Sequence, residues 1–330
     1  MNHADTLRAL YTEQPFLLAP MAGVTDGAYR LMCRSHGAKL AYSEMVSVAG
    51  LAYASEKTWE LVLPAEGEPN IAVQLFGTKP EQFASAVEAV EERVGDKLTL
   101  IDINMACPVR KVISKGEGSA LMQTPELAEE IVKACVSHAH VPVTVKMRKG
   151  FHSDNANAPE FAARMEQAGA AAVAVHGRFA SQLYHGEADW DIISRVVEKV
   201  SVPVIGSGDV MSAQDAVRMV TTTGACAAFI ARGTYGNPWI FDDALALLKD
   251  GVEPQEHSPA EKIAAFKKHL DLLHEHDCHM VRARSFANWY FKGLPGAASW
   301  RGRAVSCTTY EDFCELALAM EEQACERGLI

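Results

Sequence analysis

Short apolar segments recur along the chain at regular intervals, and from the third onward helical patterns separate them. The eight segments are Phe16–Ala19, Leu40–Ser43, Ile71–Phe76, Leu100–Asn104, Val143–Met147, Ala171–His176, Val204–Gly206 and Cys226–Ala231. The helical patterns are Pro80–Val94 and Pro125–Ala139, each opening with a proline, then Ala158–Ala168, Trp190–Val200 and Ala213–Thr223. Strands that alternate with helices form parallel βα units, and eight such units close a barrel.

An open, doubly wound sheet is the alternative arrangement for this alternation. That fold places a glycine-rich turn with the spacing G-x-G-x-x-G directly after its first strand. The corresponding segment here is APMAGVTD at residues 19–26, which contains a single glycine. The sequence therefore predicts an α/β protein with a (β/α)8 TIM barrel.

The pattern changes after residue 250. Gly251–Pro259 is a polar linker, and the segments beyond it, Ala260–His276, His279–Lys292 and Tyr310–Arg327, all have helical periodicity. We therefore expect residues 1–250 to form a catalytic barrel and residues 251–330 to form a small C-terminal helical domain packed on it.

Apolar runs and cysteines indicate the compartment. No window approaches the roughly 18–20 apolar residues of a membrane span, and the start, MNHADTLRALYTEQP, lacks the pattern of a secretory signal. The eight cysteines contain no CxxC pair, which is typical of free thiols in a reducing cytosol. We expect a cytoplasmic monomer without a metal centre and without membrane association.

Polar residues gather at the ends of the predicted strands, where TIM barrels place their chemistry. In chain order these ends carry Pro20-Met21-Ala22-Gly23, Glu44, Gln74, Asn104 with Cys107, Lys146 with Arg148, His176 with Arg178, Ser207-Gly208-Asp209 and Ala231-Arg232-Gly233. Cys107 lies in the run LTLIDINMACPVRKVISKGEGSAL, between a strand and a basic loop with two glycines. Cationic surroundings would favour a nucleophilic thiolate, whereas apolar surroundings would keep the proton and suit a general acid.

The last two strand ends predict a phosphate site. IGSGDV and IARGTYG offer glycine-rich backbone whose N–H groups can point at a phosphate, and Arg232 can neutralise its charge. Many barrels bind phosphate in this way, so this corner does not separate a flavin enzyme from an aldolase or isomerase. Gln74, Lys146 and His176 favour FMN, because an amide can hydrogen-bond the edge of the flavin and a cation stabilises its anionic reduced form.

Charge is distributed unevenly along the chain. The net charge of −11 argues against nucleic-acid binding over the whole surface. From Cys278 to Tyr310, however, there is no acidic residue, and aromatic side chains alternate with Arg282, Arg284, Lys292, Arg301 and Arg303. This stretch is either the solvated side of amphipathic helices or a surface that contacts phosphates.

Taken together, these segments resemble the tRNA-dihydrouridine synthase family, most closely its bacterial B-type branch. The similar segments are APMAGVTD (19–26), SEMVS (43–47), VQLFG (73–77), DINMACPVRKV (102–112), GSALM (118–122), VKMRKGF (145–151), HGR with QLYHGEADW (176–190), GSGDV (206–210), NPWIF (237–241) and WYFKGLPGAA (289–298). They follow the family's order along the chain. The run around Cys107 and the GLPGAA segment are the most specific of them.

The resemblance implies an enzyme that reduces the C5=C6 bond of tRNA uridines to 5,6-dihydrouridine, with FMN as cofactor and NADPH or NADH as electron donor. Cys107 would deliver the proton to C5 as a general acid. The residues implied to hold FMN are Pro20, Met21, Ala22, Gln74, Lys146, His176, Ser207, Gly208, Asp209, Ala231 and Arg232. Those implied to contact the tRNA are Asn104 and Arg148 at a flipped-out uracil, together with Arg178, Lys111, Arg282 and Arg284.

The chain also departs from the family pattern. Ala106 and Ala231 stand where glycine is usual, Ser207 replaces asparagine, Phe179-Ala180 replaces Thr-Arg, and Ser285-Phe286 replaces Lys-His. The last two changes each remove a cation that would face the tRNA. Three alternatives therefore stay open: an FMN barrel acting on a free small molecule, akin to dihydroorotate or dihydropyrimidine dehydrogenases, a non-redox phosphate-binding lyase or isomerase, and an inactive RNA-binding module.

Overall fold

Eight parallel strands pair in the order β1-β8-β7-β6-β5-β4-β3-β2 in the computed structural model, which describes residues 2–53 and 56–328. The strands are β1 (Phe16–Leu18), β2 (Tyr42–Ser47), β3 (Ile71–Phe76), β4 (Leu98–Met105), β5 (Val143–Gly150), β6 (Ala172–Phe179), β7 (Val204–Ser207) and β8 (Ala227–Ile230). β1 and β2 meet through one parallel bridge, between Leu18 and Ala41, so the barrel is nearly closed. The predicted TIM barrel is confirmed.

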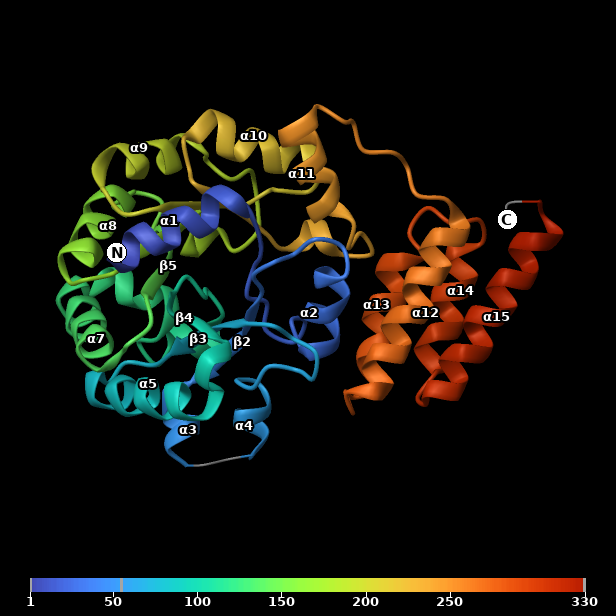
Figure 1. Ribbon diagram of the computed structural model, residues 1–330, viewed down its shortest axis with the longest axis horizontal. Helices are drawn as coiled ribbons and strands as arrows, with labels where there is room; N and C mark the ends of the chain where they lie inside the picture. The colour runs from blue at the N-terminus through green and yellow to red at the C-terminus, as the bar shows by residue number, and fades with distance from the viewer. Residues whose placement is uncertain (1, 54–55, 329–330) are drawn as a thin grey trace.

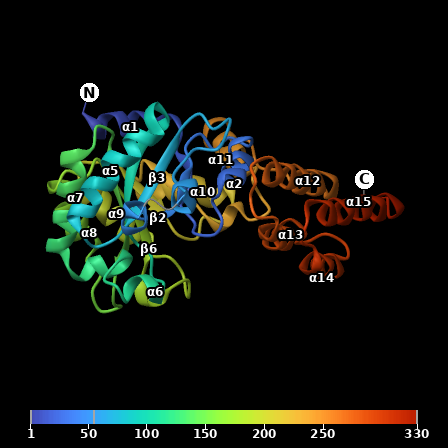
Figure 2. The ribbon, with the colours of Figure 1, turned by 90° about the horizontal axis from the view of Figure 1, so that it is seen from below.

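Helices surround the barrel on its outside (Figure 1). They are α2 (Gly27–Arg34), α3 (Val48–Ala52), α4 (Glu56–Glu60), α5 (Pro80–Val94), α7 (Pro125–His138), α8 (Ala158–Gln167), α9 (Asp191–Lys199), α10 (Ala213–Thr223) and α11 (Ile240–Asp250). The short helix α6 (Arg110–Ile113) lies at one end of the barrel instead (Figure 2). Short 3-10 helices are η1 (Gly95–Lys97), η2 (Gly118–Gln123), η3 (Ala180–Gln182), η4 (Arg232–Thr234) and η5 (Met280–Arg282). The proline-led pattern at 80–94 matches α5 at both ends, because proline at the first helical position and Gly95 after the last one fix its limits.

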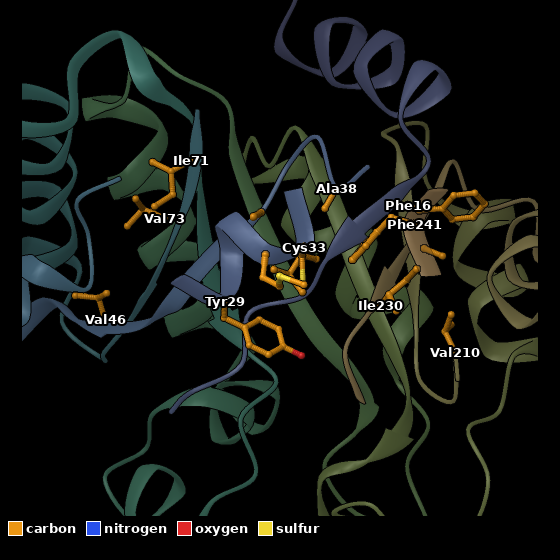
Figure 3. Close-up of a cluster of buried hydrophobic side chains, with 14 of the residues drawn as sticks. Phe16, Tyr29, Cys33, Ala38, Val46, Ile71, Val73, Val210, Ile230 and Phe241 are labelled. Carbon is orange, nitrogen blue, oxygen red and sulfur yellow. The ribbon is translucent and has the colours of Figure 1, made fainter. Parts of the chain in front are cut away.

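Residues alternate along each strand between two environments. Outward-facing aliphatic side chains pack against the helices, and Figure 3 shows part of this layer, including Cys33 of α2, Ile71 of β3 and Phe241 of α11. Inward-facing side chains form a second, separate cluster, in which Tyr42 and Phe229 pack edge to face with ring centroids 4.8 Å apart.

The N-terminal helix α1 (His3–Glu13) contributes Leu7 and Tyr11 to this inner cluster, so it covers one end of the barrel. Figure 2 shows α1 at that end and α6 at the opposite one. The chain's polar strand ends therefore open on the side of α6.

The second strand differs from its prediction. The sequence indicates a strand at 40–43, but β2 covers Tyr42–Ser47, and its pairing with β3 is irregular between Tyr42 and Met45. Ala41, which precedes β2, forms the isolated parallel bridge with Leu18. Polar Ser43 and Glu44, which break the apolar run, lie buried inside the strand.

The C-terminal helical region consists of α12 (Pro259–Glu275), α13 (Ala283–Tyr290), α14 (Ala297–Ser306) and α15 (Tyr310–Glu326). Figure 1 shows it beside α2 and α11, joined to the barrel by the linker after α11. Tyr29 of α2 packs against His269 of α12 and Phe286 of α13, with ring centroids 5.4 and 5.5 Å apart.

The predicted helix at 279–292 is divided in two. His279 caps a 3-10 turn, η5, by accepting a hydrogen bond from the backbone N–H of Val281, and α13 begins only after it. Among the described residues, no helix is long and apolar enough to cross a membrane.

Candidate active site

The carboxyl ends of the strands surround a cavity of about 350 Å³. Its lining includes every residue that the resemblance implies for FMN, namely Pro20, Met21, Ala22, Gln74, Lys146, His176, Ser207, Gly208, Asp209, Ala231 and Arg232. Cys107, Asn104 and Arg148 line the same cavity. Volumes of roughly 300–1,000 Å³ are typical of sites for cofactors and small ligands.

The strand register explains why these side chains meet. Asn104 of β4 lies opposite Lys146 of β5, and Arg148 of β5 lies opposite His176 of β6. Each residue occupies an inward position two or four places after an apolar or small inward residue of its strand. Parallel strands end at the same side of the barrel, so these polar positions form one ring around the cavity.

A buried carboxylate orders the amides of this ring. Asp102 accepts hydrogen bonds from Gln74 Nε2 and from the Thr144 hydroxyl, both at 2.6 Å. Because an ionised carboxylate only accepts, Gln74 must turn its oxygen away, where it accepts from Asn104 Nδ2 at 2.7 Å. Burial raises the pKa of Asp102 to about 6, against the lowering effects of these hydrogen bonds and of Lys146.

Asn104 carries this order to the thiol. Its Oδ1 accepts from the backbone N–H of Cys107 at 2.9 Å, while Ser119 donates to the Cys107 carbonyl through its N–H at 3.0 Å and its hydroxyl at 2.9 Å. A side chain at Gly118 would come within 2.8 Å of that carbonyl, so this close approach requires glycine. The backbone of Cys107 is thus held from both sides.

The thiol itself is suited to hold a proton. Burial raises the pKa of Cys107 above its ordinary value, although the Val109 N–H, Arg148 and Lys146 oppose the shift. Cations therefore lie near the thiol, but burial outweighs them and favours the protonated form. A protonated thiol can donate to a carbon centre that develops negative charge.

Three further cationic or titratable side chains, Lys146, His176 and Arg148, line the same cavity as the thiol. Burial, followed by the nearby Arg148, lowers the pKa of Lys146 to about 8. Burial and the surrounding cations lower the pKa of His176 well below its ordinary value, so its ring is neutral at physiological pH. Arg148 is fixed by its bonds to the carbonyls of Ala106 at 2.8 Å and of Phe179 and Leu183 at 2.9 Å.

The phosphate corner has the backbone that its sequence predicts. Gly208 and Asp209 both adopt positive φ, 112° and 55°, which turns the chain sharply after β7. A Cβ at Gly233 would lie 2.4 Å from the Val210 carbonyl, so the two loops approach closely only because this residue is glycine. Arg232 lines the cavity and pairs with Asp209 at 3.3 Å.

Four residues that the resemblance implies for the tRNA lie outside the cavity lining. Arg178 is 2% exposed and pairs with Asp209 at 2.7 Å. Lys111 is exposed on α6. Arg282 pairs with carboxylates of the barrel, and Arg284 donates to the Cys307 carbonyl at 2.9 Å.

Sequence reasoning did not single out the aromatic and apolar part of the lining. Phe229, Met45 and Tyr235 contribute to it, and Tyr184 stands at its edge with its side chain 56% exposed. The ring of Tyr184 lies 5.8 Å from the Arg148 guanidinium and 5.1 Å from that of Arg232. Tyr184 belongs to the run QLYHGEADW, which resembles the family, but the sequence alone does not indicate that its side chain lines the cavity.

The donor set fits a planar heteroaromatic cofactor with a phosphate tail. Met21, Met45 and Phe229 give apolar surface for a ring, while Gln74 and Lys146 can serve its polar edge. Arg232 and the loops at Gly208 and Gly233 offer a cation and backbone N–H groups of the kind that bind a phosphate. These features match the FMN that the sequence predicts.

Comparisons with known proteins identify the family. The family model described as "Dihydrouridine synthase (Dus)" matches residues 17–326. The "tRNA-dihydrouridine synthase B" of Pasteurella multocida is 39% identical over 283 residues, 84% of this chain and 83% of that protein. The protein with the same description from Pseudomonas aeruginosa is 40% identical over 296 residues, 87% of this chain and 86% of that protein. A mandelate oxidase structure aligns over 71% of this chain and 70% of its own with 20% identity and a TM-score of 0.45, a likeness too low for argument.

Proposed function

The chain belongs to the dihydrouridine synthase family, and from this membership we propose that it is a tRNA-dihydrouridine synthase of the B type. It uses FMN and NAD(P)H to reduce the C5=C6 bond of uridines in tRNA. The observation that carries the proposal is the cavity that Cys107, Lys146 and His176 line together. In it the thiol would be the proton donor, and burial raises the pKa of Cys107 in keeping with that role.

The flavin side of the cavity consists of residues from six strands or the loops after them. FMN would be held by Pro20, Met21, Ala22, Gln74, Lys146, His176, Ser207, Gly208, Asp209, Ala231 and Arg232, all of which line the cavity. Bound there, FMN supplies the two-electron redox chemistry that NAD(P)H drives. Lys146 would hold the polar edge of the flavin and could stabilise the negative charge that reduction brings. Burial lowers the pKa of Lys146 to about 8, and a bound anion would favour its protonated form.

The substrate side consists of Cys107, Asn104 and Arg148. A uracil must leave the tRNA stack to reach this depth, and Asn104 and Arg148 offer donors to its polar edge. The Cys107 thiol delivers the proton to C5 and the resulting thiolate is stabilised by the cations beside it. Fixing the Cys107 backbone through Asn104 and Ser119 keeps the sulfur at one position relative to the base.

The two parts of the chain divide the work. We assign catalysis to residues 1–250 and tRNA binding to residues 251–330, helped by exposed Lys111 on α6. Arg284 and Arg282 each use some of their N–H groups in bonds within the protein, so any contact with tRNA would involve the other N–H groups of each guanidinium. Arg178, buried against Asp209, would act on the substrate by supporting the loop after β7.

One chain completes the cavity, which supports a monomer. We place the enzyme in the cytoplasm, because its proposed substrate is tRNA. Gel filtration of the purified protein tests the first statement, and fractionation of the source cells tests the second.

The function is tested with the purified holoenzyme, NADPH and an unmodified tRNA transcript. We expect a yellow protein with flavin absorbance near about 450 nm and dihydrouridine in the tRNA by mass spectrometry. A colourless protein would favour the non-redox lyase or isomerase. A yellow protein that reduces a free pyrimidine and leaves tRNA unchanged would favour the small-molecule oxidoreductase.

A further inference from the structure

The side chain of one arginine of the helical region, Arg282, reaches the first loop of the barrel. Arg282 Nη1 donates to Asp26 Oδ2 at 2.9 Å and to Glu44 Oε1 at 3.0 Å. Asp26 lies at the end of the segment 19–26, and Glu44 lies in β2. Arg282 therefore joins the helical region to two barrel residues that are more than 230 positions earlier in the chain.

Both carboxylates already hold the segment 19–26. Asp26 Oδ1 accepts from the backbone N–H of Tyr29 at 2.8 Å and so caps α2. Glu44 Oε2 accepts from the backbone N–H of Gly23, which adopts a positive φ of 76°. The same segment, 19–26, carries Pro20, Met21 and Ala22, three of the residues that line the cavity.

The two carboxylates depend on Arg282 for their charge balance. Each side chain is 9% exposed, and both contact the same guanidinium nitrogen. Burial raises the pKa of Asp26, while Arg282 is the largest influence that lowers it. Arg30, the other cation near Asp26, is committed to Glu68 at 2.6 Å and to the Thr25 carbonyl at 2.9 Å. Without Arg282, two neighbouring buried carboxylates would lack a dedicated counter-ion, which is costly in a desolvated site.

The local fold explains why Arg282 points inward. It ends η5, the 3-10 turn that interrupts the helix expected at 279–292, so its side chain does not follow the face of α13. Arg284, two residues later, has the opposite arrangement, since it donates within the helical region to Cys307. Arg282 and Arg284 are therefore close in sequence but contact different parts of the protein, the barrel and the helical region respectively.

We propose that Arg282 is a positioning residue that braces the flavin loop 19–26 through Asp26 and Glu44, so that seating of the helical region strengthens FMN binding. This inference rests on the proposed function, because it assigns that loop to FMN. It gives Arg282 a task that a phosphate contact would not require.

The test compares Arg282→Gln with Arg284→Gln, measuring FMN binding to each apoprotein by flavin fluorescence and tRNA binding to each FMN-saturated protein. We expect Arg282→Gln to bind FMN about tenfold more weakly than wild type, the order expected for loss of charge-assisted hydrogen bonds. Arg284→Gln should bind FMN like wild type. Arg282→Lys, which keeps the charge, should recover part of the loss.

A further variant keeps the test decisive if Arg282→Gln folds poorly. The double variant Arg282→Gln with Glu44→Gln removes one buried charge, and the new amide oxygen can still accept from the Gly23 N–H. Its FMN affinity should be lower than that of Glu44→Gln alone, because only the double variant lacks the guanidinium that contacts Asp26. Equal affinities of these two variants would overturn the inference.

Two further results would overturn the inference in different ways. Unchanged FMN affinity in Arg282→Gln together with weakened tRNA binding would make Arg282 an RNA contact and leave the proposed function intact. A wild-type protein that takes up no FMN would overturn the proposed function and this inference with it.

Discussion

The mouth of the barrel and the helical region both carry several cations, but they arrange them in opposite ways. In the mouth, Lys146, Arg148 and Arg232 converge on one cavity. In the helical region, Arg282 turns into the barrel and Arg284 turns to Cys307. The other cations of the stretch 278–310 have no ion-pair partner among residues 2–53 and 56–328 and lie at least partly exposed; they are Lys292, Arg301 and Arg303.

The difference teaches how each region can act on a substrate. Convergence in a desolvated cavity gives charges a strong and directed effect, as the lowered pKa of Lys146 shows. Dispersed surface charges act through screened attraction to phosphates and contribute affinity rather than chemistry. Substitutions in the mouth should therefore change the rate by orders of magnitude, and those on the helical surface should change binding by smaller factors.

The largest expected effect follows replacement of Cys107 by alanine. Loss of the proton donor should lower the rate of dihydrouridine formation by about 10²–10⁴-fold, the usual contribution of a general acid. FMN content and oxidation of NADPH should stay near wild type, because the cavity's flavin wall is unchanged. The measurement is dihydrouridine per tRNA over time at saturating NADPH.

A matched control is Cys325→Ala, which removes an exposed thiol from α15. It should leave the rate unchanged. Full activity of Cys107→Ala at neutral pH would remove the thiol from the reaction and weaken the contrast between the two regions.

A second, smaller effect follows removal of the buried carboxylate that orders the amides. Asp102→Ala leaves Gln74 Nε2 without its acceptor, so Gln74 and then Asn104 lose their fixed orientation. Loss of a buried hydrogen-bond partner costs about 1–3 kcal/mol, which corresponds to roughly 5–150-fold in FMN affinity or rate. Flavin titration and single-turnover rates measure the two quantities separately.

Asp102→Asn is the conservative comparison. Its oxygen can still accept from Gln74, while its amino group can donate to the Thr144 hydroxyl, which can reverse its role. It should therefore retain most of the affinity that Asp102→Ala loses. Equal losses in both variants would mean that the negative charge matters and the amide order does not.

The barrel and its mouth could be predicted from sequence because topology decides them. Every second residue of a strand points inward, and parallel strands end at the same side of the barrel. Gln74, Asn104 and His176 therefore lie close together because of their positions in the strands, independently of their side-chain chemistry. The helix limits at 80–94 and 213–223 followed from proline, glycine and cap residues, which act locally.

The helical region lacked such a constraint. A run of basic and aromatic residues does not say which cation faces inward, because a guanidinium on a long side chain can reach a carboxylate of another element. The partner of Arg282 depends on a 3-10 turn at 280–282 and on Asp26 and Glu44, which no local pattern connects to it. Tyr184 was missed for a similar reason, since its place at the cavity depends on the path of an exposed loop.

The smallest expected effect tests the surface half of the comparison. Lys292→Glu with Arg303→Glu reverses two exposed charges of the helical region, which Figure 2 shows extending sideways from the barrel beside α2 and α11. Affinity for tRNA should fall severalfold at low salt, and the dependence of log K on log salt should become shallower by about 0.7–0.9 for each phosphate that the variant no longer neutralises. Lys97→Glu with Lys133→Glu makes the same charge change on the barrel's flank and serves as the control. Equal losses of tRNA affinity in the two double variants would mean that the helical surface acts only through net charge. A loss of affinity confined to the first pair, with the turnover of bound tRNA unchanged, would separate tRNA docking at the helices from chemistry at the mouth of the barrel.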